Sequence, residues 1–254
     1  MIVERRTWNV ECKTFWFGNI LLYTFYVLLS TNSAWAYLPG KFYPPMRVAP
    51  KKRTVEKVIV LSFDDGPGRF TIPILDLLAK HNIHATFFME GSQVEDYPNI
   101  ARQVFEAGHE IGNHTYTHFD FHKQKNANPD RLVHELEQTE SSLERALHDP
   151  TFHTKLVRMP YGYFNHTWLL PTLKEHGYAL VHWDFGTDWL LKKSAEEMTQ
   201  EYLAHAQPGE VFLFHDGGRH REKTLQAVTT VIETLEKEGY QFIPAEELFK
   251  DPPP

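Results

Sequence analysis

Short apolar runs alternate with helical patterns along most of the chain, and this alternation restricts the fold more than any other feature of the sequence. Strands that alternate with helices indicate a parallel sheet covered by helices. The runs that read as strands are 57–63, 85–89, 110–112, 155–158, 179–183, 211–215 and 241–243. The helical patterns between them cover 72–80, 98–106, 129–147, 167–175, 195–206 and 224–238. About seven repeats favour an irregular β/α barrel, although periodicity alone leaves an open doubly wound sheet as the alternative.

Two adjacent carboxylates, Asp64 and Asp65, follow the first apolar run. In a barrel, the residues after the carboxyl ends of the strands gather at one mouth, where active sites lie. Burying an ionised carboxylate without a partner is costly, so a buried pair indicates a bound cation or a catalytic role. The segment Asp-Asp-Gly-Pro at 64–67 is also a common way for a chain to leave a strand, and a plain turn is the alternative.

Two histidines, His114 and His118, follow the third strand-like run with i, i+4 spacing. On a helical turn this spacing would place both imidazoles on one face, where they could share a metal ion. A chain with 15 histidines also produces such pairs by chance, so two hydrogen-bonded surface rings are the alternative. Together with one aspartate the pair would form a three-ligand set suited to zinc or another first-row divalent ion. The second aspartate would then lie where a general base belongs.

Polar residues also follow three later runs. Arg158 could orient a carboxylate, and the turn at Tyr161 could present a backbone N–H to a developing oxyanion. Asp188 offers a carboxylate beside the ring of Trp189, and His215 is a candidate general acid.

Composition limits the remaining choices. A chain of 254 residues with 42% hydrophobic residues is large enough for one full core. The net charge of −7 and the scattered Lys and Arg residues argue against a nucleic-acid partner. Because Cys12 is the only cysteine, a metal ion would have to be held by His, Asp or Glu. The acidic residues of the long helical pattern, Glu135, Glu137, Glu140 and Glu144, are predicted to form a solvated face.

The first 36 residues resemble a secretory signal. An apolar stretch at 20–29 follows basic residues and precedes Ala34 and Ala36, which fit an A-x-A cleavage site. An uncleaved anchor is the alternative, because residues 15–17 could lengthen a stretch that otherwise falls short of the ~20 residues of a spanning helix. We therefore expect a secreted or periplasmic protein, with membrane contact only if this segment is kept. A Pro-rich extended segment is expected at 37–55 and one domain at 56–250.

The motifs SFDDGP, HTYTH, RMPYG, DW and LFH, in this order over about 57–248, resemble those of the polysaccharide deacetylases. This family is also called the NodB-homology domain or carbohydrate esterase family 4. The resemblance implies a distorted (β/α)7 barrel that removes acetyl groups from sugars with one divalent metal ion. We expect zinc, with cobalt or nickel as alternatives.

The resemblance also implies roles for individual residues on the metal side of the site. Asp64 corresponds to the general base, and Arg158 to the arginine that holds this base. The backbone N–H of Tyr161 corresponds to a donor of the oxyanion hole, and Tyr161 is also expected to contact substrate. The metal ligands implied are Asp65, His114 and His118.

On the opposite side, His215 corresponds to the general acid. Asp188 is the expected partner of this acid, but Asp184 lies close enough in sequence to be an alternative. Trp189 and Leu213 are expected to line the pocket for the acetyl group.

The expected substrate is an acetylated polysaccharide or oligosaccharide, with peptidoglycan or another N-acetylglucosamine glycan preferred because the protein is expected to be exported. The expected enzyme is a monomeric hydrolase of carbon–nitrogen bonds other than peptide bonds. An O-acetyl esterase acting on xylan-type glycans and a glycan-binding member without catalysis are the alternatives.

Overall fold

The strands pair in parallel wherever the structure describes them. The protein was analysed as a computed structural model that describes residues 56–190 and 192–249. The predicted signal or anchor at 1–36 and the extended segment at 37–55 both lie outside these residues. The strands are β1 (Val58–Gly66), β2 (Thr86–Met89), β3 (Glu110–Asn113), β4 (Leu156–Val157), β5 (Ala179–Leu180), β6 (Phe185–Gly186), β7 (Glu210–His215) and β8 (Gln241–Phe242). They form an eight-stranded sheet in the order β5-β4-β3-β2-β1-β7-β6, and β8 pairs with β1.

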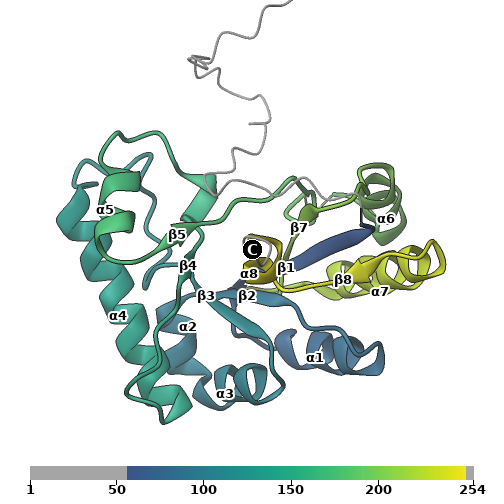
Figure 1. Ribbon diagram of the computed structural model, residues 1–254, viewed down its shortest axis with the longest axis horizontal. Helices are drawn as coiled ribbons and strands as arrows, with labels where there is room; N and C mark the ends of the chain where they lie inside the picture. Colours follow the sequence, from purple (N-terminus) through teal and green to yellow (C-terminus); the bar gives the residue numbers. More distant parts are fainter. Residues whose placement is uncertain (1–55, 191, 250–254) are drawn as a thin grey trace, which may run out of the picture. The chain divides into compact units, whose positions relative to one another are not determined.

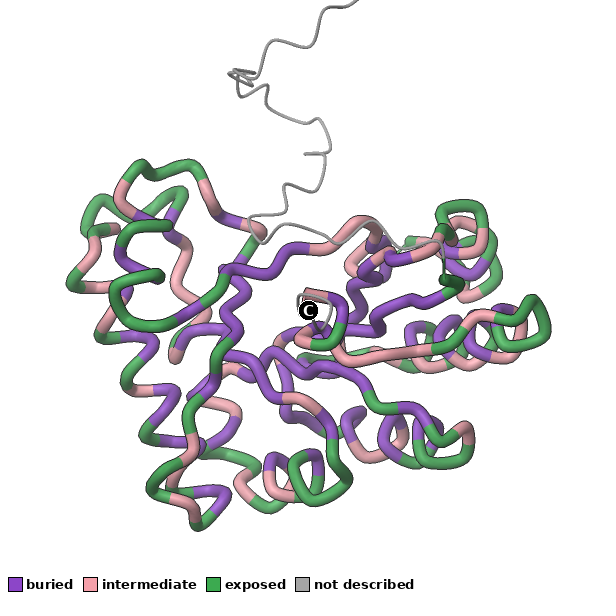
Figure 2. Tube along the Cα trace, viewed as in Figure 1, coloured by how far each residue is buried: buried purple, intermediate pink, exposed green. Residues whose placement is uncertain are grey.

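Helices connect these strands. They are α1 (Thr71–Lys80), α2 (Gly91–Asp96), α3 (Pro98–Glu106), α4 (Pro129–Leu147), α5 (Leu169–Glu175), α6 (Ala195–Ala204), α7 (Glu222–Lys237) and α8 (Ala245–Phe249), with a 3-10 turn, η1, at Pro160–Gly162. Figure 1 shows the strands in an arc around α8, with the longer helices outside. Figure 2 shows that most residues of the longer strands are buried, whereas the helices alternate buried and exposed residues. Of the residues described, no helix is both long and apolar enough to cross a membrane.

The distorted barrel is confirmed as a curled parallel sheet. Its two edge strands, β5 and β6, do not pair with each other in the part of the chain that the structure describes, so a seam stays open between them. Three short elements, β6, α2 and α8, have no counterpart among the predicted ranges. A two-residue strand is too short to show alternation, and helices of five or six residues are too short to show helical periodicity.

Alternation along β1 separates the two faces of the sheet. Ile59, Leu61 and Phe63 point outward and join the core that β1 forms with α1, α3, α6 and α7. Val58 and Val60 point inward and pack in a cluster that includes Leu248 of α8. Successive strand residues face opposite sides, so Ser62 and Asp64 continue the inner face. The interior of the barrel is therefore apolar at the α8 end and polar at the mouth.

Candidate active site

The aspartate pair lies within β1 rather than after it, because the strand continues to Gly66. Asp64 is in register with His215 of β7. The register with β2 shifts between Asp64 and Gly66, and Asp65 adopts a left-handed φ of 67°. Such an irregularity breaks the strict alternation of side chains. Both carboxylates therefore reach His114, whose Nε2 is 3.7 Å from Asp64 Oδ2 and 3.4 Å from Asp65 Oδ1.

Asp65, His114 and His118 form a cluster that suits a divalent metal ion. One ligand atom from each lies within 4.8 Å of the others, and His118 Nε2 is 3.3 Å from Asp65 Oδ1. This oxygen is buried without a hydrogen-bond partner among the described residues. His114 Nδ1 lies 2.7 Å from the carbonyl oxygen of Arg158, so a proton on Nδ1 leaves the Nε2 lone pair facing the cluster. A buried oxygen without a donor, faced by imidazole nitrogens, is what a bound cation would satisfy.

The electrostatics of Asp65 agree with this arrangement. Burial alone would raise the pKa of Asp65, but the neighbouring imidazoles of His114 and His118 lower it well below its usual value. Asp65 is therefore a carboxylate at neutral pH, which is the form that binds a metal ion.

The predicted helical turn at 114–118 is wrong. Thr115 and His118 are left-handed, with φ of 66° and 52°, and the segment is a loop. Buried Glu135 of α4 accepts hydrogen bonds from the backbone N–H groups of Tyr116 (3.0 Å) and Thr117 (2.7 Å). The predicted solvated face of α4 is therefore also wrong at Glu135, which is 0% exposed because it holds this loop. It is wrong as well at Glu140, which is 8% exposed and accepts a hydrogen bond from the Thr154 N–H.

Arg158 and Asp64 form a buried ion pair beside the cluster. Arg158 NH1 donates to Asp64 Oδ1 and to Ser62 Oγ, each at 2.8 Å. The same guanidinium donates to the carbonyl oxygens of Val181 (3.2 Å) and His182 (3.3 Å). Arg158 is 0% exposed, so a charge in this position requires these partners. Its bonds fix Asp64 with one oxygen on the arginine and the other toward the metal cluster.

His215 lies at the end of β7 with Asp188 as its partner. His215 Nδ1 is 2.7 Å from Asp188 Oδ1, and the His215 backbone N–H donates to Asp188 Oδ2 at 2.9 Å. Asp184 instead accepts a hydrogen bond from the Val211 N–H at 2.7 Å, which decides between the two aspartates. Burial lowers the pKa of His215, but Asp188 outweighs it and raises this pKa to about 9. His215 is therefore cationic at neutral pH.

The remaining predicted residues lie around these groups. Tyr161 is left-handed at φ 59°, and its ring meets the His118 ring edge-on at 4.6 Å between centroids. Its side chain is 61% exposed and available to a ligand. Trp189 packs edge-on against His215, with 5.9 Å between ring centroids. A Cβ built on Gly186 would lie 2.7 Å from Trp189 and 3.0 Å from Leu213, so both side chains adjoin this glycine.

Three residues of the site were not among the predictions. Ser62 binds Arg158, and its position two residues before Asp64 on the inner face of β1 could have indicated it. Thr224 Oγ1 donates to Asp188 Oδ2 at 3.0 Å. Arg221 lies 3.9 Å from both Asp65 and Asp188. No spacing in the sequence points to Thr224 or Arg221, because the fold of the segment after β7 brings them to the site.

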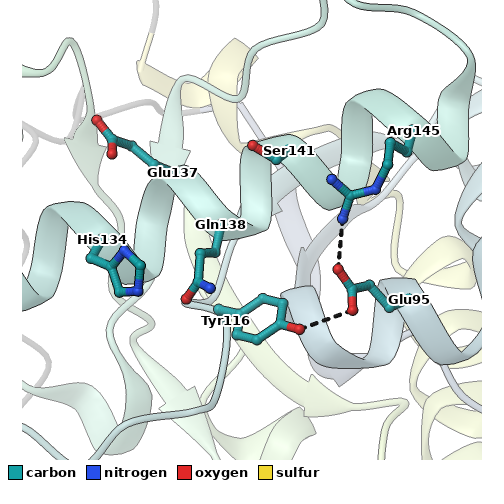
Figure 3. A pocket seen from close by; sticks show the side chains of 7 residues that line it. All are labelled: Glu95, Tyr116, His134, Glu137, Gln138, Ser141 and Arg145. Carbon is teal, nitrogen blue, oxygen red and sulfur yellow. Dashed lines mark hydrogen bonds and ion pairs between the residues drawn. The ribbon is translucent and has the colours of Figure 1, made fainter.

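A separate surface cavity of about 310 Å³ lies beside α4. Figure 3 shows Arg145 and Tyr116 directed at Glu95, with contacts of 2.6 and 2.9 Å. Its lining residues are Glu95, Tyr116, His134, Glu137, Gln138, Ser141 and Arg145. It contains none of the predicted site residues.

Comparisons with known proteins find similar sequences and a similar fold. The family model described as polysaccharide deacetylase matches residues 51–181. A peptidoglycan-N-acetylglucosamine deacetylase of Bacillus cereus is 35% identical, over 77% of this chain and 89% of that protein. A chitooligosaccharide deacetylase of Sinorhizobium fredii is 31% identical, over 77% of this chain and 93% of that protein. The crystal structure of the Bc1960 peptidoglycan N-acetylglucosamine deacetylase has a TM-score of 0.71 and 33% identity, over 78% of this chain and 91% of that chain.

Proposed function

The chain belongs to the polysaccharide deacetylase family, and from this membership we propose that it hydrolyses the N-acetyl groups of N-acetylglucosamine units in a glycan and releases acetate. One observation carries the proposal. The unpartnered Asp65 oxygen faces two imidazoles. The adjacent Asp64, held by Arg158, is in register across β1 and β7 with His215, which is held by Asp188. A base, a cation site and an acid are the groups that amide hydrolysis needs.

Asp65, His114 and His118 would hold one divalent ion, with zinc preferred for two imidazoles and a carboxylate, and cobalt or nickel as alternatives. When bound, this ion supplies Lewis acidity toward water and the acetyl carbonyl oxygen. Asp64 takes a proton from the attacking water while Arg158 holds one of its oxygens. The Tyr161 N–H donates to the oxyanion that develops on the carbonyl oxygen.

His215 completes the reaction. An amide nitrogen is a poor leaving group unless it is protonated, so His215 gives its proton to this nitrogen as the carbon–nitrogen bond breaks. Asp188 keeps the imidazole protonated and aligned. Trp189 and Leu213, which adjoin Gly186 beside the acid, line the acetyl pocket. The products are acetate and a free amino sugar.

Peptidoglycan is the preferred substrate, supported by the names of the similar proteins from Bacillus cereus and by the signal-like N-terminal segment. We also propose that the catalytic domain spans 56–250 and that the enzyme is exported and monomeric. The similar chitooligosaccharide deacetylase makes a shorter N-acetylglucosamine chain the second substrate to test.

Acetate release tests the proposal. We expect the metal-loaded protein to release acetate from peptidoglycan, and more slowly from chitooligosaccharides. Release from acetylated xylan alone would favour the O-acetyl esterase, and metal binding without acetate release from any glycan would favour a non-catalytic member. Either result would contradict N-deacetylation.

A further inference from the structure

Arg221 lies between the two functional carboxylates of the site. It immediately precedes α7, and its side chain is 11% exposed. One terminal nitrogen, NH2, is 3.9 Å from Asp65 Oδ2, and the other, NH1, is 3.9 Å from Asp188 Oδ2. A single guanidinium thus faces both the proposed metal ligand and the partner of the proposed acid.

In both carboxylates, Oδ1 faces an imidazole and Oδ2 faces Arg221. Asp65 turns Oδ1 toward His114 and His118, and Oδ2 toward Arg221. Asp188 turns Oδ1 toward His215 Nδ1, and Oδ2 toward Arg221 as well as toward the His215 backbone N–H and Thr224 Oγ1. The terminal torsion of an aspartate is broad, so the side chain alone does not fix which oxygen faces which partner. The positive charge of Arg221, 3.9 Å from Oδ2 of each aspartate, favours the orientation in which this oxygen faces the guanidinium and the other oxygen faces its own partner.

The backbone around Arg221 fixes it relative to the aspartate pair. Arg221 Nε donates to the carbonyl oxygen of Gly217 at 2.9 Å. Gly217 packs directly on Asp65, because a Cβ there would lie 1.8 Å from the Asp65 carbonyl oxygen. The Gly217 N–H also points to the Asp64 carbonyl oxygen at 3.3 Å. Arg221 is therefore anchored to a backbone segment that packs on Asp64 and Asp65.

We propose that Arg221 is a positioning residue that holds Asp65 and Asp188 in one fixed relation, and so aligns the metal ion with the acid His215. This inference rests on the proposed function, since it assumes a metal ion on Asp65 and an acid on Asp188. Arg221 itself does not touch the reacting atoms. It acts through the two carboxylates.

The zinc affinity of the full-length Arg221→Ala variant tests this proposal, because the two possible roles of Arg221 change this affinity in opposite directions. If Arg221 acted only by its charge, its removal would relieve repulsion and tighten the binding of a cation. If it aligns Asp65, its removal should weaken zinc binding roughly 10- to 100-fold, as for other residues that orient metal ligands. Zinc is titrated into metal-free protein in competition with a chromophoric chelator. Unchanged or tighter binding would overturn the proposal.

Turnover supplies the second readout. We expect kcat of Arg221→Ala to fall roughly 10- to 100-fold at saturating zinc, because Asp188 and His215 also lose their alignment. Arg221→Lys should restore little, since one ammonium cannot face both carboxylates, whereas added guanidinium should partly restore Arg221→Ala. The matched control is Arg219→Ala, two residues away at an exposed position, which should behave as wild type.

Folding and function can be told apart in this design. If Arg221→Ala does not fold, Arg221→Lys carries the same two expectations, and wild-type zinc affinity and kcat in Arg221→Lys would contradict the bridging role. If no glycan is deacetylated by the wild-type protein, the proposed function fails while the zinc titration still decides whether Arg221 aligns Asp65. A loss in Arg221→Ala that guanidinium does not restore, in protein with lowered thermal stability, would assign Arg221 to the fold alone.

Discussion

At the scale of single residues, neighbouring aspartates have different proposed tasks because their partners differ. Asp64 is bound by Arg158, whereas Asp65 faces two imidazoles and Arg221. The sequence predicted both aspartates and the two histidines, because each follows or ends a strand at the barrel mouth. It did not predict Arg221, whose contact with Asp65 spans over 150 residues and depends on the path of the segment after β7.

The division between the aspartates predicts different losses on mutation. Asp64→Asn should lower kcat by roughly 10²- to 10⁴-fold, as expected for a general base, while zinc content stays at the wild-type value. His114→Ala should lose both activity and zinc, since it removes one of three ligands. Acetate release and metal analysis of the purified variants measure both effects. Full activity in zinc-loaded Asp64→Asn would rule out its role as the base.

His215 predicts how activity depends on pH. Despite burial, Asp188 raises the pKa of His215 to about 9, so the acid is protonated below this pH and activity should fall above it. Asp188→Asn removes the adjacent negative charge and should move this alkaline limb of kcat/KM to lower pH by roughly 1–3 units. Asp184→Asn is the matched control, because Asp184 binds the Val211 N–H instead. An alkaline limb that stays in place in Asp188→Asn would contradict the pairing.

At the scale of elements, the sequence located the longer strands and helices, but not the loops that shape the site. The i, i+4 histidine pair suggested a helical turn, whereas left-handed residues and the buried Glu135 give a loop. This loop still brings both imidazole rings to the same oxygen of Asp65. Tertiary contacts of α4 decide this conformation, and they lie outside any local pattern. The short strand β6 was not predicted either, because Phe185 and Gly186 form a strand through their pairing with β7 and show no alternation of their own.

The contact between Gly217 and β1 predicts a further effect on this element. Gly217→Ala would place a Cβ against the Asp65 carbonyl oxygen, which cannot move without displacing β1. We expect a loss of about 1–3 kcal/mol in the free energy of unfolding, as for overpacked sites, together with weaker zinc binding. Gly68→Ala is the control, since its Cβ would lie 3.4 Å from the Asp216 carbonyl oxygen. Urea titration compares the two variants, and equal stability would show that the strand can shift at little cost.

At the scale of the whole molecule, the alternation of strands and helices predicted the curled parallel sheet. It could not predict that the sheet stays open between β5 and β6, because closure depends on the pairing of two-residue strands. It also did not predict that α8 fills the end of the barrel away from the site, where Leu248 packs with Val58 and Val60. Both features arise from contacts between distant segments.

Stability in acid is a property of the whole fold to which His109 contributes. Burial, followed by the nearby charge of His84, lowers the pKa of His109 to about 4 from 6.5. Between these values the unfolded chain binds the proton and the folded chain does not, so stability falls as pH decreases from 6.5 to 4. At 1.36 kcal/mol per pKa unit, the free energy of unfolding decreases by about 3 kcal/mol over this pH range.

The variant His109→Asn isolates this contribution. Its side-chain oxygen can still accept the hydrogen bond that Ala85 N–H donates to His109 Nδ1 at 3.1 Å, but it cannot be protonated in this range. Urea unfolding at pH 7 and pH 4.5 should show a smaller acid-induced loss in the variant than in the wild type. Equal losses would mean that other groups account for the acid sensitivity.

The bonds of Arg158 have a consequence for how sequences of this family are compared. Besides Asp64, Arg158 binds the carbonyl oxygens of Val181 and His182, which lie in the segment that connects β5 to β6, the two strands that do not pair with each other among the described residues. Selection for a folded protein would therefore keep this arginine even in a lineage that no longer catalysed any reaction. Its presence in a relative would therefore not by itself indicate activity, which under the proposed mechanism also needs the base Asp64, the three metal ligands and the acid His215.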